Sequence, residues 1–144
     1  MLCNGLKTSE RVIMEKFTID GAYLVGNELL DAQHKVILNY MAKVYTNLLA
    51  GKKGNDLFAL IDRLDTYCKL HFLDEEQMMG EIEFPEIADH KAQHALFVTN
   101  LENFMGRYED QNSVKSIDDL IFLKGWFLEH IDAFDTRYSV YKKL

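Results

Sequence analysis

Apolar residues recur every three or four positions over four long stretches of the chain, which is the spacing of helices that each bury one face. The stretches cover residues 28–50, 55–79, 85–108 and 116–141, and the connections between them are short. Short connections join antiparallel neighbours. The pattern therefore predicts an all-α protein, an up-down-up-down antiparallel four-helix bundle.

Residues typical of helix ends support these limits. We expect Asn55 to cap the second helix, Gly80 to stop it, and Pro85 to be the first residue of the third. The sequence "SIDD" at 116–119 resembles a capping box that opens the fourth helix.

The first 27 residues are less regular, and we interpret them as an arm that lies across the bundle. Its predicted packing residues are Phe17, Ile19, Tyr23 and Val25. A length of 144 residues suits one domain with a substantial core, so we expect residues 1–144 to form a single domain.

Composition narrows the function classes. The net charge of −7 disfavours nucleic acid and anionic membranes as partners, because both require a basic face. No apolar run is long enough to cross a bilayer, so we expect a soluble, cytoplasmic protein. We also expect a monomer, with room for a protein partner that the sequence does not reveal. Cys3 and Cys68 form no recognisable motif; we expect Cys3 in a loose terminus and Cys68 in the core.

Polar residues interrupt the apolar stripe of every predicted helix. All five histidines fall on these inward positions, together with two carboxylates: His34, His71, Glu75, His90, His94, His130 and Asp135. One inward histidine is more often a hydrogen-bonded core residue than a ligand. Five of five, joined by two carboxylates, predict a metal site.

The sequence "DHKAQH" places His90 and His94 one helical turn apart, where two imidazoles can hold one metal ion. Zinc proteases of the H-E-x-x-H type need a glutamate after the first histidine as general base, and this chain has Lys91 there. Proteolysis is therefore disfavoured.

An unpaired buried polar group costs about 2–7 kcal/mol, so this set of side chains needs a partner. Imidazole with carboxylate suits iron, zinc or copper better than calcium or magnesium. The set is too large for one ion, which implies two ions bridged by the carboxylates. Two octahedral ions have twelve coordination positions. The five histidines, two bridging carboxylates and one bridging oxygen fill eleven and leave one open to a small gas.

His130 and Asp135 are five residues apart, which on a regular helix separates their directions by about 140°. Both can face one centre only if the helix widens between them. We therefore predict a π-helical turn at this point.

The four motifs together resemble the hemerythrin family, most closely the single-domain bacterial members. They are "DAQHK" with His34, "HFLDEE" with His71 and Glu75, "HKAQH" with His90 and His94, and "WFLEHIDAFD" with His130 and Asp135. The resemblance runs from about Phe17 to Tyr138, and Tyr138 itself matches a family position.

The resemblance implies a non-haem centre of two oxo- or hydroxo-bridged iron ions that binds dioxygen reversibly. His34 and His71 would bind one iron, His90, His94 and His130 the other, and Glu75 and Asp135 would bridge them. Dioxygen would bind at the iron with two histidines. The residues that would line this position are Ile37, Phe72, Trp126, Phe127 and Ile131.

One feature departs from the family pattern. Members often carry a tryptophan a few residues before a "Y-x-V-G" segment, and here "FTIDGAYLVG" has Ile19 in that neighbourhood.

Two alternative functions stay open beside oxygen carriage, storage or delivery. The site could sense oxygen or redox state and act through a separate partner protein. It could also serve a di-iron oxidase, a peroxidase or an iron-handling protein, although ferritin-like sites use E-x-x-H motifs and no glutamate here stands three residues before a histidine. We therefore favour a carrier over an enzyme.

Overall fold

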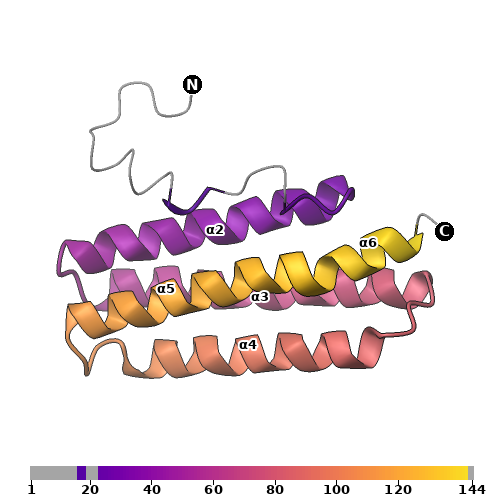
Figure 1. Cartoon of the computed structure of the whole chain (residues 1–144). Coiled ribbons are helices and arrows are strands. Elements are labelled where there is room, and N and C mark those ends of the chain that lie inside the picture. Colours follow the sequence, from indigo (N-terminus) through magenta and orange to yellow (C-terminus); the bar gives the residue numbers. More distant parts are fainter. Residues whose placement is uncertain (1–15, 19–22, 143–144) are drawn as a thin grey trace, which may run out of the picture.

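The computed structural model describes residues 16–18 and 23–142, and four long helices dominate them (Figure 1). These are α2 (Glu28–Leu49), α3 (Asn55–Glu81), α4 (Ile87–Arg107) and α5 (Ser113–His130). Helix α5 continues through a π-helical turn, η2 (Ile131–Asp135), into α6 (Thr136–Lys142). Helix α2 packs on α3, α3 on α4, α4 on α5, and α5 on α2, which closes a ring. The predicted antiparallel four-helix bundle is confirmed.

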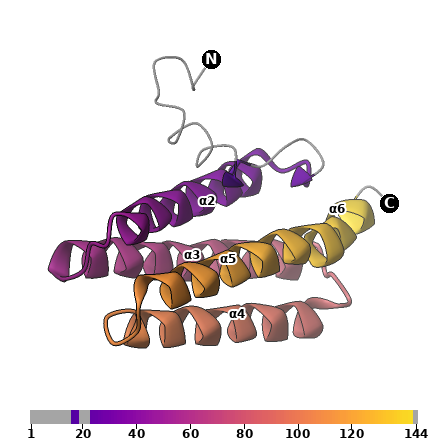
Figure 2. The same cartoon turned by 60° about the vertical axis from the view of Figure 1, so that its left-hand side comes forward.

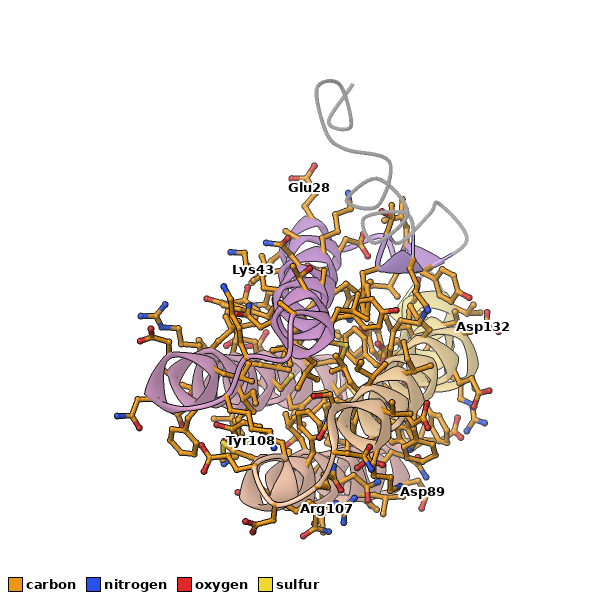
Figure 3. All side chains as sticks on the ribbon, turned by 90° about the vertical axis from the view of Figure 1, so that its left-hand side faces the viewer. Glu28, Lys43, Asp89, Arg107, Tyr108 and Asp132 are labelled. Atoms are coloured by element: carbon orange, nitrogen blue, oxygen red, sulfur yellow. The ribbon has the colours of Figure 1, made fainter. Side chains whose placement is uncertain are left out.

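The interior of the bundle has two unlike halves. The half near the loops α2–α3 and α4–α5, which faces the viewer in Figure 3, is apolar. Its fully or almost fully buried side chains are Met41, Val44, Leu48, Leu57, Ile61, Leu64, Leu101, Phe104, Tyr108, Leu120 and Leu123. A buried side chain of this size contributes about 1.5–3 kcal/mol. This half therefore supplies stability, while the other half contains the buried histidines with Glu75 and Asp135.

Helix α3 begins and ends differently from the prediction. Asn55 is its first residue, and the cap position belongs to Gly54, whose φ of 97° requires glycine. Gly80 does not stop the helix, which runs to Glu81. The left-handed residue after this helix is Glu83, with a φ of 55°.

Helices α4 and α5 also start at other residues than predicted. Pro85 lies in the turn before α4, which begins at Ile87. Helix α5 begins three residues before "SIDD", because the Asn112 side chain accepts a hydrogen bond from the Lys115 backbone N–H at 2.8 Å. An asparagine cap of this kind satisfies one of the free N–H groups of the first turn.

The described part of the arm packs on α2 and α5. The Phe17 ring is buried, with its centroid 5.3 Å from that of Tyr45, and Lys124 Nζ lies 5.4 Å from its centre. Lys124 also donates a hydrogen bond to the Lys16 carbonyl at 3.0 Å.

A second anchor lies just before α2, where the arm meets the last helix (Figure 2). The Val25 N–H donates to Asp31 Oδ1 at 2.8 Å, and its carbonyl accepts from Ser139 Oγ at 2.6 Å. Tyr23 packs on the core, as predicted. Ile19 lies outside the described residues.

Cys68 is fully buried, as predicted, whereas Cys3 lies outside the described residues. Among the helices that the structure describes, none has both the length and the apolar character needed to span a membrane.

The same substitution at two glycines should change stability in opposite directions. Gly54→Ala places a Cβ at a φ of 97° and should destabilise the fold by about 1–3 kcal/mol. Gly106→Ala lies in α4 with open space around the new Cβ, and should stabilise by up to about 1 kcal/mol. Urea unfolding at equal metal content measures both. Equal effects of the two variants would contradict the assigned backbone conformation.

Candidate metal centre

The polar half of the interior brings together the seven predicted ligands from all four long helices and the π turn. Each is at most 3% exposed: His34 on α2, His71 and Glu75 on α3, His90 and His94 on α4, His130 at the end of α5, and Asp135 in η2. Residues spread over about one hundred positions of sequence thus meet at one level of the bundle.

The ligand atoms fall into two overlapping groups, each with atoms within 4.8 Å of one another. One group contains three imidazoles, from His90, His94 and His130, with Glu75 and Asp135. The other contains two imidazoles, from His34 and His71, with Glu75. The two groups share Glu75 and differ in their number of histidines.

The two carboxylate oxygens of Glu75 face different groups. Oε1 lies 2.9 Å from His94 Nε2 and 3.0 Å from His90 Nε2. Oε2 lies 3.5 Å from His71 Nε2 and 3.8 Å from His34 Nε2. Glu75 therefore spans both groups, one oxygen to each.

Asp135 repeats this arrangement from the opposite helix. Its Oδ1 lies 3.0 Å from His90 Nε2 and 3.1 Å from His130 Nε2, whereas Oδ2 lies 3.3 Å from His34 Nε2. Both carboxylates thus direct one oxygen toward each group of imidazoles.

The π turn η2 is what allows Asp135 to face inward. The Thr136 N–H donates to the Ile131 carbonyl five residues back, which widens the helix by one residue. The π turn predicted between His130 and Asp135 is confirmed.

The carboxylates dominate the electrostatics of the ligand set. Burial alone would lower the pKa of His34 and His90, but the nearby carboxylates of Asp135 and Glu75 raise each to about 9. Burial lowers the pKa of His71 to about 4. Burial opposes ionisation of Glu75 and Asp135, yet the surrounding imidazoles hold both carboxyl pKa values below their usual range. Both carboxylates are thus charged and able to bind cations.

Two ligands have hydrogen-bond partners on their second ring nitrogen. His71 Nδ1 lies 2.7 Å from Gln33 Oε1, and the Gln33 amide donates to Asp74 Oδ2 at 2.8 Å. His94 Nδ1 lies 2.7 Å from Glu76 Oε2. Such partners fix the ring orientation and leave Nε2 free for a metal.

Sequence reasoning missed Gln33 and Glu76. Gln33 had a detectable signal, because it lies three residues after the buried Leu30, on the inward face of α2. Glu76 had no detectable signal beyond being next to Glu75, since its partner, His94, is on another helix. Tyr138, which sequence reasoning singled out, donates its buried hydroxyl to Glu75 Oε2 at 3.0 Å.

Metal ions would satisfy the polar atoms of these seven side chains better than the side chains satisfy one another. Among the described residues, both ring nitrogens of His34 and His130 and both oxygens of Asp135 are buried without a hydrogen-bond partner. Two ligand atoms about 2.1 Å from one metal at a right angle lie about 3.0 Å apart, close to the distances from Asp135 to His90 and His130. Metal binding would satisfy atoms that otherwise cost several kcal/mol to bury.

Three of the five predicted pocket residues, Ile37, Phe127 and Ile131, are completely buried. The Phe127 ring centroid lies 5.6 Å from that of His34 and 6.4 Å from that of His71. Phe127 therefore lies against the two-histidine group.

Phe72 and Trp126 contact the three-histidine group. The Phe72 ring stacks on His94 at 4.0 Å and reaches His71 at 5.5 Å. The Trp126 ring stacks on His130 at 5.1 Å with an interplanar angle of 8°. Among the described residues its other ring contact is with Phe97, so the ring contacts of Trp126 are not with the two-histidine group.

The fold and this site define a histidine-rich metal-binding four-helix bundle. Residues 25–138 match the model of the hemerythrin HHE cation binding domain. The chain belongs to the hemerythrin family, and its buried histidine and carboxylate cluster is a hemerythrin-type metal site.

Curated relatives cover most of the chain at low identity. A bacteriohemerythrin of Clostridium acetobutylicum is 26% identical over 118 residues, 79% of this chain and 92% of the relative. A bacteriohemerythrin of Methylococcus capsulatus is 29% identical over 76% of this chain and 82% of its own length. A myohemerythrin of Riftia pachyptila is 27% identical, over 83% and 88% respectively. No solved structure matches the chain.

Metal removal should destabilise the protein. A metal present at 100 times its Kd contributes about 2.7 kcal/mol, and in a chain of this size each kcal/mol corresponds to about 2–4 °C in Tm. Anaerobic chelation of the iron-loaded protein should therefore lower Tm by about 5 °C or more, as measured by circular dichroism. An unchanged Tm after complete metal loss would contradict the fit of these residues to a metal.

Loss of the Gln33 hydrogen bond should weaken metal binding without unfolding the bundle. Gln33→Ala leaves His71 Nδ1 without its partner, and such changes cost about 10–100-fold in metal affinity. Competition with a chelator measures this loss. Gln77→Ala is the matched control, because Gln77 is an exposed glutamine of α3 whose side chain, among the described residues, donates to Glu81. Equal affinities of the two variants would refute the orienting role of Gln33.

Proposed function

We propose that the chain binds two iron ions through these seven residues and uses them to bind dioxygen reversibly, for carriage, storage or delivery. The observation that supports this most directly is the division of both carboxylates, Glu75 and Asp135, between two groups of imidazoles. A single ion would not require both carboxylates to face two ways.

His34 and His71 would hold one iron, and His90, His94 and His130 the other, with Glu75 and Asp135 as bridges. Two adjacent ferrous ions supply the electrons that dioxygen takes up when it binds and returns when it leaves. The donor set of imidazole and carboxylate suits iron.

The two groups differ by one histidine, and this difference makes the site asymmetric. His90, His94 and His130 would supply three imidazoles to one iron, whereas His34 and His71 would supply only two to the other and would leave more room there for a further ligand. We therefore place dioxygen on the side of His34 and His71.

Apolar side chains protect that position from water. Ile37 lies one turn after His34, and the Phe127 ring lies edge-on to His34. Dry surroundings disfavour charged species that would separate from the site, and so favour release of neutral dioxygen over oxidation of the iron.

Tyr138 holds the bridging carboxylate in place. Its hydroxyl donates to Glu75 Oε2, the oxygen that faces the two-histidine group. Burial raises the pKa of Tyr138, so this hydroxyl keeps its proton and remains a donor.

The same composition of ligands favours binding over oxidation chemistry. The site has five imidazoles and two carboxylates, whereas ferritin-like oxidation sites are built mainly from carboxylates. Fewer anionic ligands stabilise high-valent iron less, so we propose a carrier rather than an enzyme.

A visible absorption spectrum with iron analysis tests this function. The anaerobically reduced protein should be nearly colourless with two irons per chain, gain a visible band in air, and lose that band under vacuum over repeated cycles. Band formation that no vacuum reverses would contradict the carrier and leave an oxidase or a redox sensor.

Removal of one ligand separates the site from the rest of the fold. His71→Ala should abolish the reversible band, because the two-histidine position then holds a single imidazole. Asp62→Asn, at an exposed position of α3, should leave the band unchanged.

A further inference from the structure

Trp126 connects a buried metal ligand to the surface. Its ring lies parallel to that of His130, with 5.1 Å between centroids, and the residue is only partly buried, whereas His130 is 3% exposed. Phe97 supports the indole from the core side, at 4.9 Å. The indole is thus a conjugated ring with one side toward the ligand and access to solvent.

Stacking is also what orients His130. Among the described residues its Nδ1 has no hydrogen-bond partner, in contrast to His71 and His94. Instead the imidazole is sandwiched between Trp126 and Phe134, whose ring lies at 5.4 Å and 14°. The nearly parallel indole and imidazole rings, with 5.1 Å between centroids, offer a short step for an electron from Trp126 to His130.

Exposed apolar side chains lie near Trp126. Phe122, one turn earlier on α5, is 61% exposed, and it lines a small hollow together with Asn100, Arg107 and Asp119. Leu96, one turn before Asn100 on α4, is 49% exposed. Exposed apolar patches of this kind mark interaction sites.

The cations on this side of α4 and α5 are already paired. Arg107 and Lys115 both bind Asp119, with N–O distances of 3.6 and 2.9 Å, and Arg137 binds Glu86 at 3.0 Å. They therefore offer little positive charge to a partner.

Acidic residues surround the patch without such partners. Asp89, Asp118 and Glu129 are exposed, and none has a cationic partner among the described residues. Figure 3 shows Asp89 and Asp132 on this side of the bundle, and Glu28 on another. These acidic residues form a negative rim around the patch, which matches a cationic partner. Small interfaces, below about 1,200 Å², are typical of electron-transfer pairs.

We infer that the α4–α5 face around Trp126, Phe122 and Leu96 docks a cationic one-electron donor protein, and that Trp126 passes its electrons to His130. This rests on the two-iron site of the proposed function. Two donors lose one electron each, both irons go from ferric to ferrous, and solvent supplies the protons that the bridging oxygen takes up. The transfer restores the state that binds dioxygen.

Fluorescence quenching tests the surface without any metal. Trp126 is the single tryptophan of the chain, so its emission reports this face alone. In the metal-free protein, quenching by caesium and by iodide is compared at equal ionic strength, each relative to its quenching of free N-acetyltryptophanamide, and this relative quenching should be stronger for caesium. Asp118→Asn with Glu129→Gln should reduce this difference, whereas Glu28→Gln should not. Stronger relative quenching by iodide, or none by either ion, would overturn the docking surface for a cationic partner.

Reduction kinetics test the path itself. The diferric protein is mixed anaerobically with hexaammineruthenium(II), a cationic one-electron donor, and loss of the diferric absorption is followed. At equal iron content, Trp126→Leu should slow reduction several-fold, and Trp126→Phe should lie between the leucine variant and the parent. The double variant Asp118→Asn with Glu129→Gln should also be reduced more slowly, and its reduction rate should depend less on salt. A Trp126→Leu protein reduced as fast as the parent would overturn the relay.

The two proposals fail in distinguishable ways. The reduction measurement requires iron but no reversible oxygen band, so it can succeed when the carrier function fails. Normal oxygenation cycles with Trp126-independent reduction would refute this inference alone.

Discussion

The two carboxylates buried among five imidazoles are the constraint on which the structure depends. Glu75 and Asp135 each direct one oxygen to one group of histidines and the other oxygen to the second group. This is possible only if α3 and η2 have fixed rotations and heights relative to α2 and α4. The requirement extends to the backbone, because Asp135 reaches the centre only through the π turn. A regular helix would leave a carboxylate outside and one bridge missing.

The cost of such an interior explains why the bundle is divided into two halves. Polar ligands contribute little to folding until metal binds, and several have no hydrogen-bond partner among the described residues. The apolar half, from Met41 and Leu48 to Leu120 and Leu123, holds the helices together independently. The arm adds further stabilising contacts, because the side chains of Phe17 and Val25 are buried against the bundle. Helix positions are thus set by one half, and the ligands of the other half are brought together by those positions.

Sequence periodicity predicted the helices and the inward position of every proposed ligand, because burial on one helical face is a local property. It also predicted the π turn, since the spacing from His130 to Asp135 fits no regular helix. The predicted helix ends were wrong because neighbouring residues compete for the cap position. Gly54, not Asn55, caps α3, and Asn112, not the "SIDD" segment, caps α5. The partners of His71 and His94 lie on other helices or depend on rotamers, and periodicity carries no such information.

The hydrogen bonds outside the ligand set make the two proposed iron positions chemically unequal as well as unequal in ligand number. His94, in the three-histidine group, has the carboxylate of Glu76 on its Nδ1, whereas His71, in the other group, has the neutral amide of Gln33. A carboxylate partner makes an imidazole a stronger electron donor than an amide does. With iron at both proposed positions, the one with three histidines would therefore receive more charge, and the one with two would be the stronger Lewis acid. Ligand number and ligand strength thus favour the same location for a bound gas, next to Phe127.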